Sequence, residues 1–160
     1  MRVGISGHQR LRDPGGWEWV RGRMRDCLAS LPPPVVGLTS LAVGADTLFA
    51  ELVLELGGAL EVIVPFAGYE GGFESEGDRR EYRRLFGAAA RVEVLGGNAT
   101  DEEGYYAAGK RIADLSDLLV LVWDGKPAAG LGGTGDIAEY ARRTHKPFLH
   151  LNPETRTVTR

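Results

Sequence analysis

The feature that most constrains the fold is a stretch near the end of the chain, LLVLVWDGKPAAGLGGTGDIAEYA, at residues 118–141. It begins with an apolar run, Leu118 to Trp123, as expected of a strand covered on both faces. Several glycines follow, and then Ile137, Tyr140 and Ala141 recur at helical spacing. We therefore expect a buried strand, a glycine-rich loop and the start of a helix, in that order.

The glycine-rich loop points to a ligand. Gly132, Gly133 and Gly135 permit tight backbone paths and close approach of another molecule. The backbone N–H groups at a helix start, with the helix dipole behind them, favour a phosphate or another anion. We therefore expect a nucleotide-type small molecule to bind here.

The rest of the chain repeats the same alternation of strand and helix. Apolar, β-branched runs predict strands at 2–6, 35–40, 60–65, 91–95, 118–123 and 146–151, separated by helical patterns such as 17–31 and 79–90. This alternation is typical of an α/β fold with a mainly parallel central sheet between two layers of helices. We expect one domain over residues 1–151, followed by a polar C-terminal tail at 152–160.

Composition narrows the function classes. The net charge of -3 gives no bulk attraction to DNA or RNA, so we expect no nucleic-acid partner. The single cysteine, Cys27, excludes an internal disulfide and fits a reducing compartment. With no signal peptide or membrane-length apolar run in view, we expect a cytoplasmic protein without a membrane partner. No cluster has metal-ligand spacing, and we expect neither a metal nor a cofactor.

Three further loops follow predicted strands, and ligands bind beyond the carboxyl ends of strands in an open parallel sheet. The first carries Ser6, Gly7, His8 and Arg10, either as a site or as a solvated turn. The second carries Gly44, Ala45 and Asp46. Asp46 either caps the helix, holds a ribose hydroxyl or orders the neighbouring loop. The third, at residues 66–78, is a candidate lid whose aromatic rings stack on a base or pack on the core.

Two of these segments, VVGLTSLAVGADTLFAE and DLLVLVWDGKPAAGLGGTGDIAEYAR, resemble the signatures of the SLOG superfamily, and GISGHQRL resembles its opening. That superfamily includes the DNA-processing protein DprA and the LOG phosphoribohydrolases. The resemblance implies a Rossmann-like three-layer sandwich and a nucleotide ligand bound by the loops after the first, second and fifth strands. It carries over to Gly7, Gly44, Asp46, Gly132, Gly133 and Thr134, with Thr134 donating its hydroxyl and N–H to a phosphate.

The match to LOG enzymes departs at the catalytic position. Their PGGxGTxxE pattern ends in a catalytic Glu, whereas the corresponding residue here is Ile137. We therefore expect a nucleotide-binding sensor or carrier module, acting as a homo-oligomer.

The alternative function is an enzyme that hydrolyses or transfers the N-glycosidic bond of a nucleoside or nucleoside monophosphate, of LOG-like or deoxyribosyltransferase-like type. Its carboxylates would be Asp124, Asp136 and Glu139, the acids near the glycine-rich loop. Release of free base distinguishes the two functions.

Overall fold

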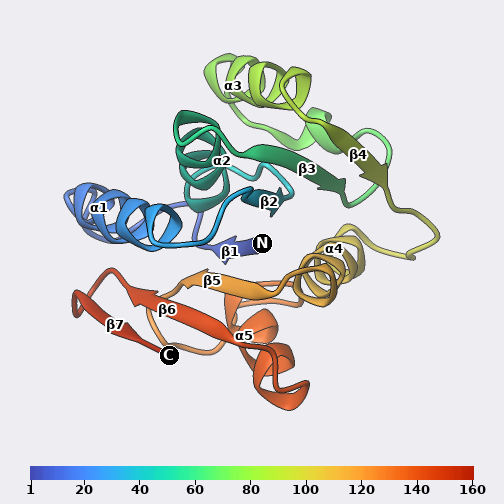
Figure 1. The fold of residues 1–160 in the computed structure, drawn as a ribbon. Coiled ribbons are helices and arrows are strands. Elements are labelled where there is room, and N and C mark those ends of the chain that lie inside the picture. Colours follow the sequence, from blue (N-terminus) through green and yellow to red (C-terminus); the bar gives the residue numbers. More distant parts are fainter.

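The computed structural model describes all residues, 1–160. Seven strands form one sheet: β1 (Arg2–Gly7), β2 (Val36–Thr39), β3 (Ala59–Val64), β4 (Arg91–Val94), β5 (Leu118–Val122), β6 (Phe148–Asn152) and β7 (Thr157–Thr159). Five α-helices connect them: α1 (Gly16–Ala29), α2 (Ala45–Glu55), α3 (Glu76–Gly87), α4 (Asp101–Leu115) and α5 (Thr134–Arg143). The predicted α/β sandwich with a mainly parallel sheet is confirmed (Figure 1).

The strand order is β4-β3-β2-β1-β5-β6-β7, and every neighbouring pair is parallel except β6 and β7. Starting from β1, the chain first builds β2, β3 and β4 on one side and then β5 and β6 on the other. The order therefore reverses between β1 and β5. In open sheets of this kind, the crevice for a ligand lies beyond the carboxyl ends of the strands at this switch point.

Helices α1, α2 and α3 cover one face of the sheet, and α4 and α5 cover the other (Figure 1). The central position of β5, between the two layers of helices, explains why its sequence is apolar at every residue. Val120 and Val122 point to the core under α1–α3, whereas Leu119, Leu121 and Trp123 point to the core under α4 and α5. Both faces of the strand are thus buried, as parallel strands require.

The segment predicted as a polar tail contains a strand. Thr157–Thr159 pairs antiparallel with β6, with Leu151 opposite Val158. This strand is exposed and only three residues long, so it has no apolar pattern to reveal it. Its turn is held by the side chain of Asn152, which accepts hydrogen bonds from the backbone N–H groups of Glu154 and Thr155 at 3.0 and 3.2 Å.

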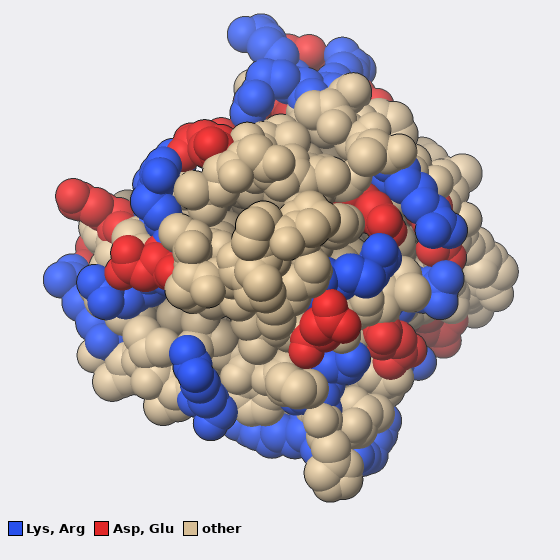
Figure 2. All heavy atoms as spheres, viewed as in Figure 1, with Lys and Arg blue, Asp and Glu red and all other residues tan.

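Helix α3 also differs from expectation, because it begins at Glu76 rather than Arg79. Ser75 caps it by accepting a hydrogen bond from the backbone N–H of Asp78. No helix combines the length and the apolar character needed to cross a membrane. On the face seen in Figure 2, basic and acidic side chains are interspersed around a broad uncharged area.

Candidate functional site

A cavity of about 640 Å³ lies at the switch point, where β1, β2, β3 and β5 end. We call it the main cavity. It collects residues from four loops that are far apart in the sequence. Of the residues predicted for the site, it is lined by Ser6, Gly7, His8, Asp46, Asp124, Gly132, Gly133, Thr134 and Gly135.

The start of α5 presents unpaired hydrogen-bond donors to this cavity. Thr134 lines it with only 8% of the residue exposed, and its hydroxyl, which makes no hydrogen bond within the protein, is open to the cavity. The N-cap, Gly133, provides no side chain to cap the helix. The backbone N–H groups of Thr134 and Gly135 are among the first four of the helix, which have no intrahelical acceptor. A helix start with these donors suits an anion.

Close backbone contacts explain why the loop before α5 is rich in glycine. Gly132 has a φ of +88°, and a Cβ atom there would lie 2.9 Å from the carbonyl oxygen of Glu102 in α4. A Cβ atom on Gly135 would lie 2.8 Å from the backbone nitrogen of Ala128. The side chain of Asp136 accepts a hydrogen bond from the N–H of Gly132 at 2.9 Å. The loop is thus folded tightly onto α4 and α5, and Asp136 braces it from outside the cavity wall.

The first two loops are joined by close backbone contact. A Cβ atom on Gly44, whose φ is +93°, would overlap the backbone of Gln9. Ala45 donates its backbone N–H to the carbonyl oxygen of His8 at 3.1 Å, and a Cβ atom on Gly7 would lie 2.5 Å from the Cβ of Ala45. Gly44 and Ala45 do not line the cavity; they hold the two loops together beneath it.

Asp46 orders the loop after β2. Its Oδ2 accepts hydrogen bonds from the hydroxyl of Thr39 at 2.9 Å and the backbone N–H of Ser40 at 3.0 Å. The residue is 5% exposed. Burial raises the pKa of Asp46 to about 6, and the hydrogen bonds from Thr39 and the loop backbone oppose this rise only in part. Of the three roles considered for Asp46, the geometry supports the ordering of the neighbouring loop.

The candidate lid at residues 66–78 contributes Tyr69 and Phe73 to the cavity wall. Their rings meet edge to face with centroids 5.3 Å apart, and the ring of Tyr105 from α4 lies 6.3 Å from that of Tyr69. Burial, and to a smaller extent the negative charge of Asp46, raises the pKa of Tyr69. The lid aromatics therefore pack on one another and also face the cavity.

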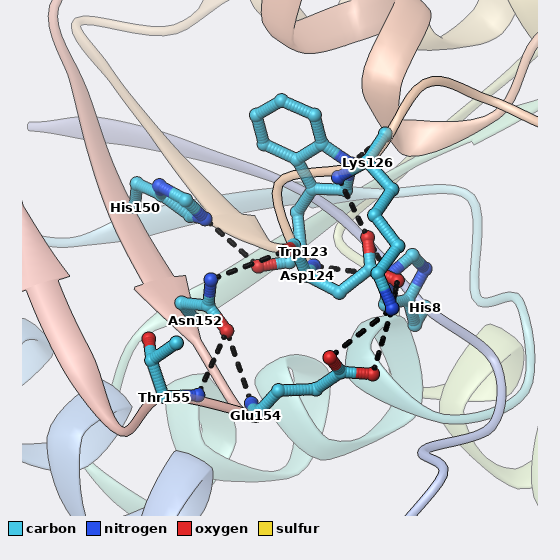
Figure 3. A network of polar contacts seen from close by, with 8 residues as sticks. All are labelled: His8, Trp123, Asp124, Lys126, His150, Asn152, Glu154 and Thr155. Atoms are coloured by element: carbon cyan, nitrogen blue, oxygen red, sulfur yellow. Dashed lines mark hydrogen bonds and ion pairs between the residues drawn. The ribbon is translucent and has the colours of Figure 1, made fainter.

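His8 and Asp124 meet at the ends of β1 and β5 (Figure 3). The Nε2 atom of His8 lies 3.1 Å from the backbone nitrogen of Asp124 and 3.3 Å from its Oδ1. The carboxylate also accepts a hydrogen bond from the N–H of Lys126 at 3.0 Å. Burial raises the pKa of Asp124, but the Lys126 N–H and the nearby His8 and Lys126 outweigh it and lower the pKa below its usual value.

His8 and Asp124 also line a second cavity of about 600 Å³. We call it the arginine cavity, because three arginines enter its wall. It lies between the loop after β1 and the turn between β6 and β7, and Arg10 belongs here rather than to the main cavity. Its walls are formed by His8, Arg10, Leu11, Arg12, Asp13, Asp124, Pro153, Glu154 and Arg156.

Some residues predicted for the site line neither cavity, and several residues that line the cavities were not predicted from the sequence. Glu139 is exposed on α5 and lines neither cavity. Tyr105 and Gly109 enter the main cavity from α4, where helical spacing gave no sign of a ligand. Arg12 was not predicted as a site residue, and Arg156 lies in the segment predicted as a polar C-terminal tail. No group of three or more His, Cys, Asp or Glu residues has an arrangement that could hold a metal ion.

No family model matches the sequence. No curated protein is similar to it at a significant level. Solved structures are similar to it. DNA processing protein A from Helicobacter pylori, which binds single-stranded DNA, matches 94% of this chain with a TM-score of 0.63 and 17% identity.

DNA processing protein A (DprA) from Streptococcus pneumoniae matches 93% of this chain with a TM-score of 0.64 and 15% identity. The chain spans 64% and 49% of the lengths of these two proteins. At such low identity the likeness is one of fold. The chain therefore shares, over most of its length, the Rossmann-like fold of DNA processing protein A.

Proposed function

We propose that the chain binds a nucleotide or nucleotide derivative in the main cavity, as a sensor or carrier module. The observation that carries the proposal is Thr134, a residue only 8% exposed that lines the main cavity at a helix start and whose hydroxyl makes no hydrogen bond within the protein, so that this oxygen is open to the cavity. Its hydroxyl and the N–H groups of Thr134 and Gly135 supply donors for one phosphate.

The aromatic part of the cavity wall suits the base. Tyr69, Phe73 and Tyr105 line the cavity with aromatic rings, and a base stacks on such rings in many nucleotide sites. A small nucleotide fits the charge of the chain better than a polyanion, because a net charge of -3 opposes the counterion-driven binding of DNA. The ligand we propose is therefore smaller than the DNA bound by the Helicobacter protein.

The test is titration calorimetry with nucleoside monophosphates, preceded by a thermal-shift screen to find the preferred base. A bound ligand raises the melting temperature in a concentration-dependent way. Thr134→Val keeps the shape of the side chain but removes its hydroxyl, so we expect a loss of affinity of about tenfold or more. Glu139→Gln, on the same helix but outside both cavities, is the matched control and should bind like the wild type.

An unchanged dissociation constant in Thr134→Val would remove the helix start from the site. Absence of any shift with every nucleotide would contradict the proposed function itself. The circular dichroism spectrum of the variant should match that of the wild type. This control is needed because a methyl group replaces the hydroxyl in a mostly buried residue.

Asp124 favours a second candidate function, cleavage of an N-glycosidic bond. Its pKa is lowered, so it is ionised at neutral pH beside His8 at the cavity wall. A carboxylate in this state stabilises an oxocarbenium-like centre while water adds to the sugar and the base leaves with a proton. Chromatographic detection of free base from a bound nucleotide, abolished in Asp124→Asn, would support the enzyme; an intact nucleotide would support the sensor.

A further inference from the structure

The two cavities share part of their walls. His8 and Asp124 line both, so the pair stands as a partition between the main cavity and the arginine cavity. The volumes are similar, at about 640 and 600 Å³, and each exceeds what one phosphate group occupies. A ligand that contacts His8 and Asp124 in the main cavity therefore also lies next to the arginine cavity.

The arginine cavity has a cation that no acid neutralises. Its carboxylates are already engaged: Glu154 pairs with Lys126 at 3.2 Å, and Asp13 accepts from the N–H of Gly15 at 3.0 Å. Arg10 pairs with Glu74 of the lid at 3.1 Å, and Arg156 lies 4.0 Å from Asp13. Arg12 forms no ion pair, although it lines the same cavity.

The His8–Asp124 partition, unlike the arginine cavity, favours hydroxyl groups over phosphates. Its acid is Asp124, whose carboxylate lies 3.3 Å from Nε2 of His8 and 3.8 Å from Nζ of Lys126 and accepts hydrogen bonds from hydroxyl groups more readily than it admits a phosphate. A ligand that crosses here should therefore place a sugar next to Asp124 and His8. Its anionic groups should lie on the two sides, one at Thr134 and one at Arg12 and Arg156.

We propose that the ligand is a nucleoside bisphosphate, with one phosphate at the start of α5, its ribose against the His8–Asp124 partition and its second phosphate in the arginine cavity. The proposal rests on the function proposed above and specifies its ligand class. A diphosphate chain on one ribose carbon does not meet this description, because both phosphates then lie on the same side of the sugar.

Two isomers hold the number of phosphates constant and change only their positions on the ribose. Adenosine 3′,5′-bisphosphate and adenosine 5′-diphosphate have the same number of phosphates, and AMP has one fewer. Calorimetric titration of the wild type, repeated with the guanosine, cytidine and uridine series, should give a dissociation constant about tenfold lower for the bisphosphate than for the monophosphate. The 5′-diphosphate should show a smaller gain.

The double variant Arg12→Gln/Arg156→Gln should reduce the advantage of the bisphosphate over the monophosphate to less than about threefold, while monophosphate binding stays unchanged. Arg23→Gln is the matched control, because it removes one exposed arginine of α1 that pairs with Asp26 outside both cavities. It should preserve the full advantage.

The outcomes separate the two proposals. If monophosphates bind and the bisphosphate gains nothing, the second subsite is wrong and the nucleotide function stands. If the 5′-diphosphate gains as much as the bisphosphate, or if Arg23→Gln removes the advantage equally, the arrangement of the phosphates is wrong. If no nucleotide of either kind binds, both proposals fail together.

Discussion

The imidazole of His8 lies against the carboxylate of Asp124, with Nε2 3.3 Å from Oδ1, although 116 residues separate the two in the chain. The backbone supports this contact, because His8 donates its N–H to the carbonyl oxygen of Val122 at 3.0 Å. The contact between the two chain segments thus extends one residue beyond the paired strands, first through the backbone of His8 and then through its side chain. The contact places a carboxylate and an imidazole at the switch point of the sheet, between the two cavities.

The contact between the first two loops should make Gly44 indispensable. Gly44→Ala both forces a non-glycine residue into positive φ and places a methyl group on the backbone of Gln9. We expect a loss in the free energy of unfolding of more than about 2 kcal/mol, measured by urea denaturation. Gly57→Ala is the control, since Gly57 has a φ of +76° but open space around it. It should cost about 1 kcal/mol, and an equal cost in both variants would contradict the steric argument.

The buried carboxylate of Asp46 should make stability depend on pH. Its pKa is about 6 in the folded chain and about 3.9 when unfolded, so between these values the folded state binds more protons. The stabilisation from Asp46 is therefore present at low pH and lost as pH rises through 6. Lowering the pH from 7 to 5 should add roughly 1 kcal/mol through this group.

The variant Asp46→Asn isolates this contribution, because an amide oxygen still accepts the hydrogen bonds from Thr39 and Ser40 but does not titrate. The difference in unfolding free energy between wild type and variant should change by roughly 1 kcal/mol between pH 7 and pH 5. A constant difference would show that Asp46 has an ordinary pKa.

Tyr105 and Tyr106 are neighbours on α4 with different surroundings. Tyr105 lines the main cavity, with its ring 5.7 Å from that of Phe66, whereas Tyr106 packs on the core under α4 and α5. Tyr105→Ala should weaken nucleotide binding by about tenfold, because a stacking ring is lost. Tyr106→Ala should lower the melting temperature while leaving the dissociation constant nearly unchanged; the reverse pattern would exclude Tyr105 from the base site.

The ion pair of Arg2 with Glu61 should matter more than that of Arg10 with Glu74. Arg2 donates two hydrogen bonds to Glu61, at 3.0 and 2.8 Å, and the carboxylate side chain is only 14% exposed. Glu61→Gln should cost about 1 kcal/mol in the free energy of unfolding. Glu74→Gln breaks a pair whose partners are both mostly solvated and should cost less than about 0.5 kcal/mol.

The sequence by itself determined the layered architecture. An apolar run such as Leu118–Trp123 needs cover on both faces, and alternation with helices leaves a parallel sheet as the arrangement that provides it. Parallel strands end at one edge, so the polar residues that follow β1 and β5 had to gather there. For this reason the loops that carry His8, Asp46 and Thr134 are predicted to form the ligand site, whereas the sequence assigns no partner to His8, and its contact with Asp124 follows from the pairing of β1 with β5.

Only the tertiary structure decided what each of these residues contacts. Gly44 meets Gln9 and Gly132 meets α4 through packing between segments that the sequence places far apart. Strand β7 exists because the free edge of β6 pairs with a short polar segment, for which no apolar pattern was needed. The arginine cavity likewise joins the loop after β1 to the turn between β6 and β7. Such long-range contacts depend on the shapes of the packed elements, and local residue patterns do not encode those shapes.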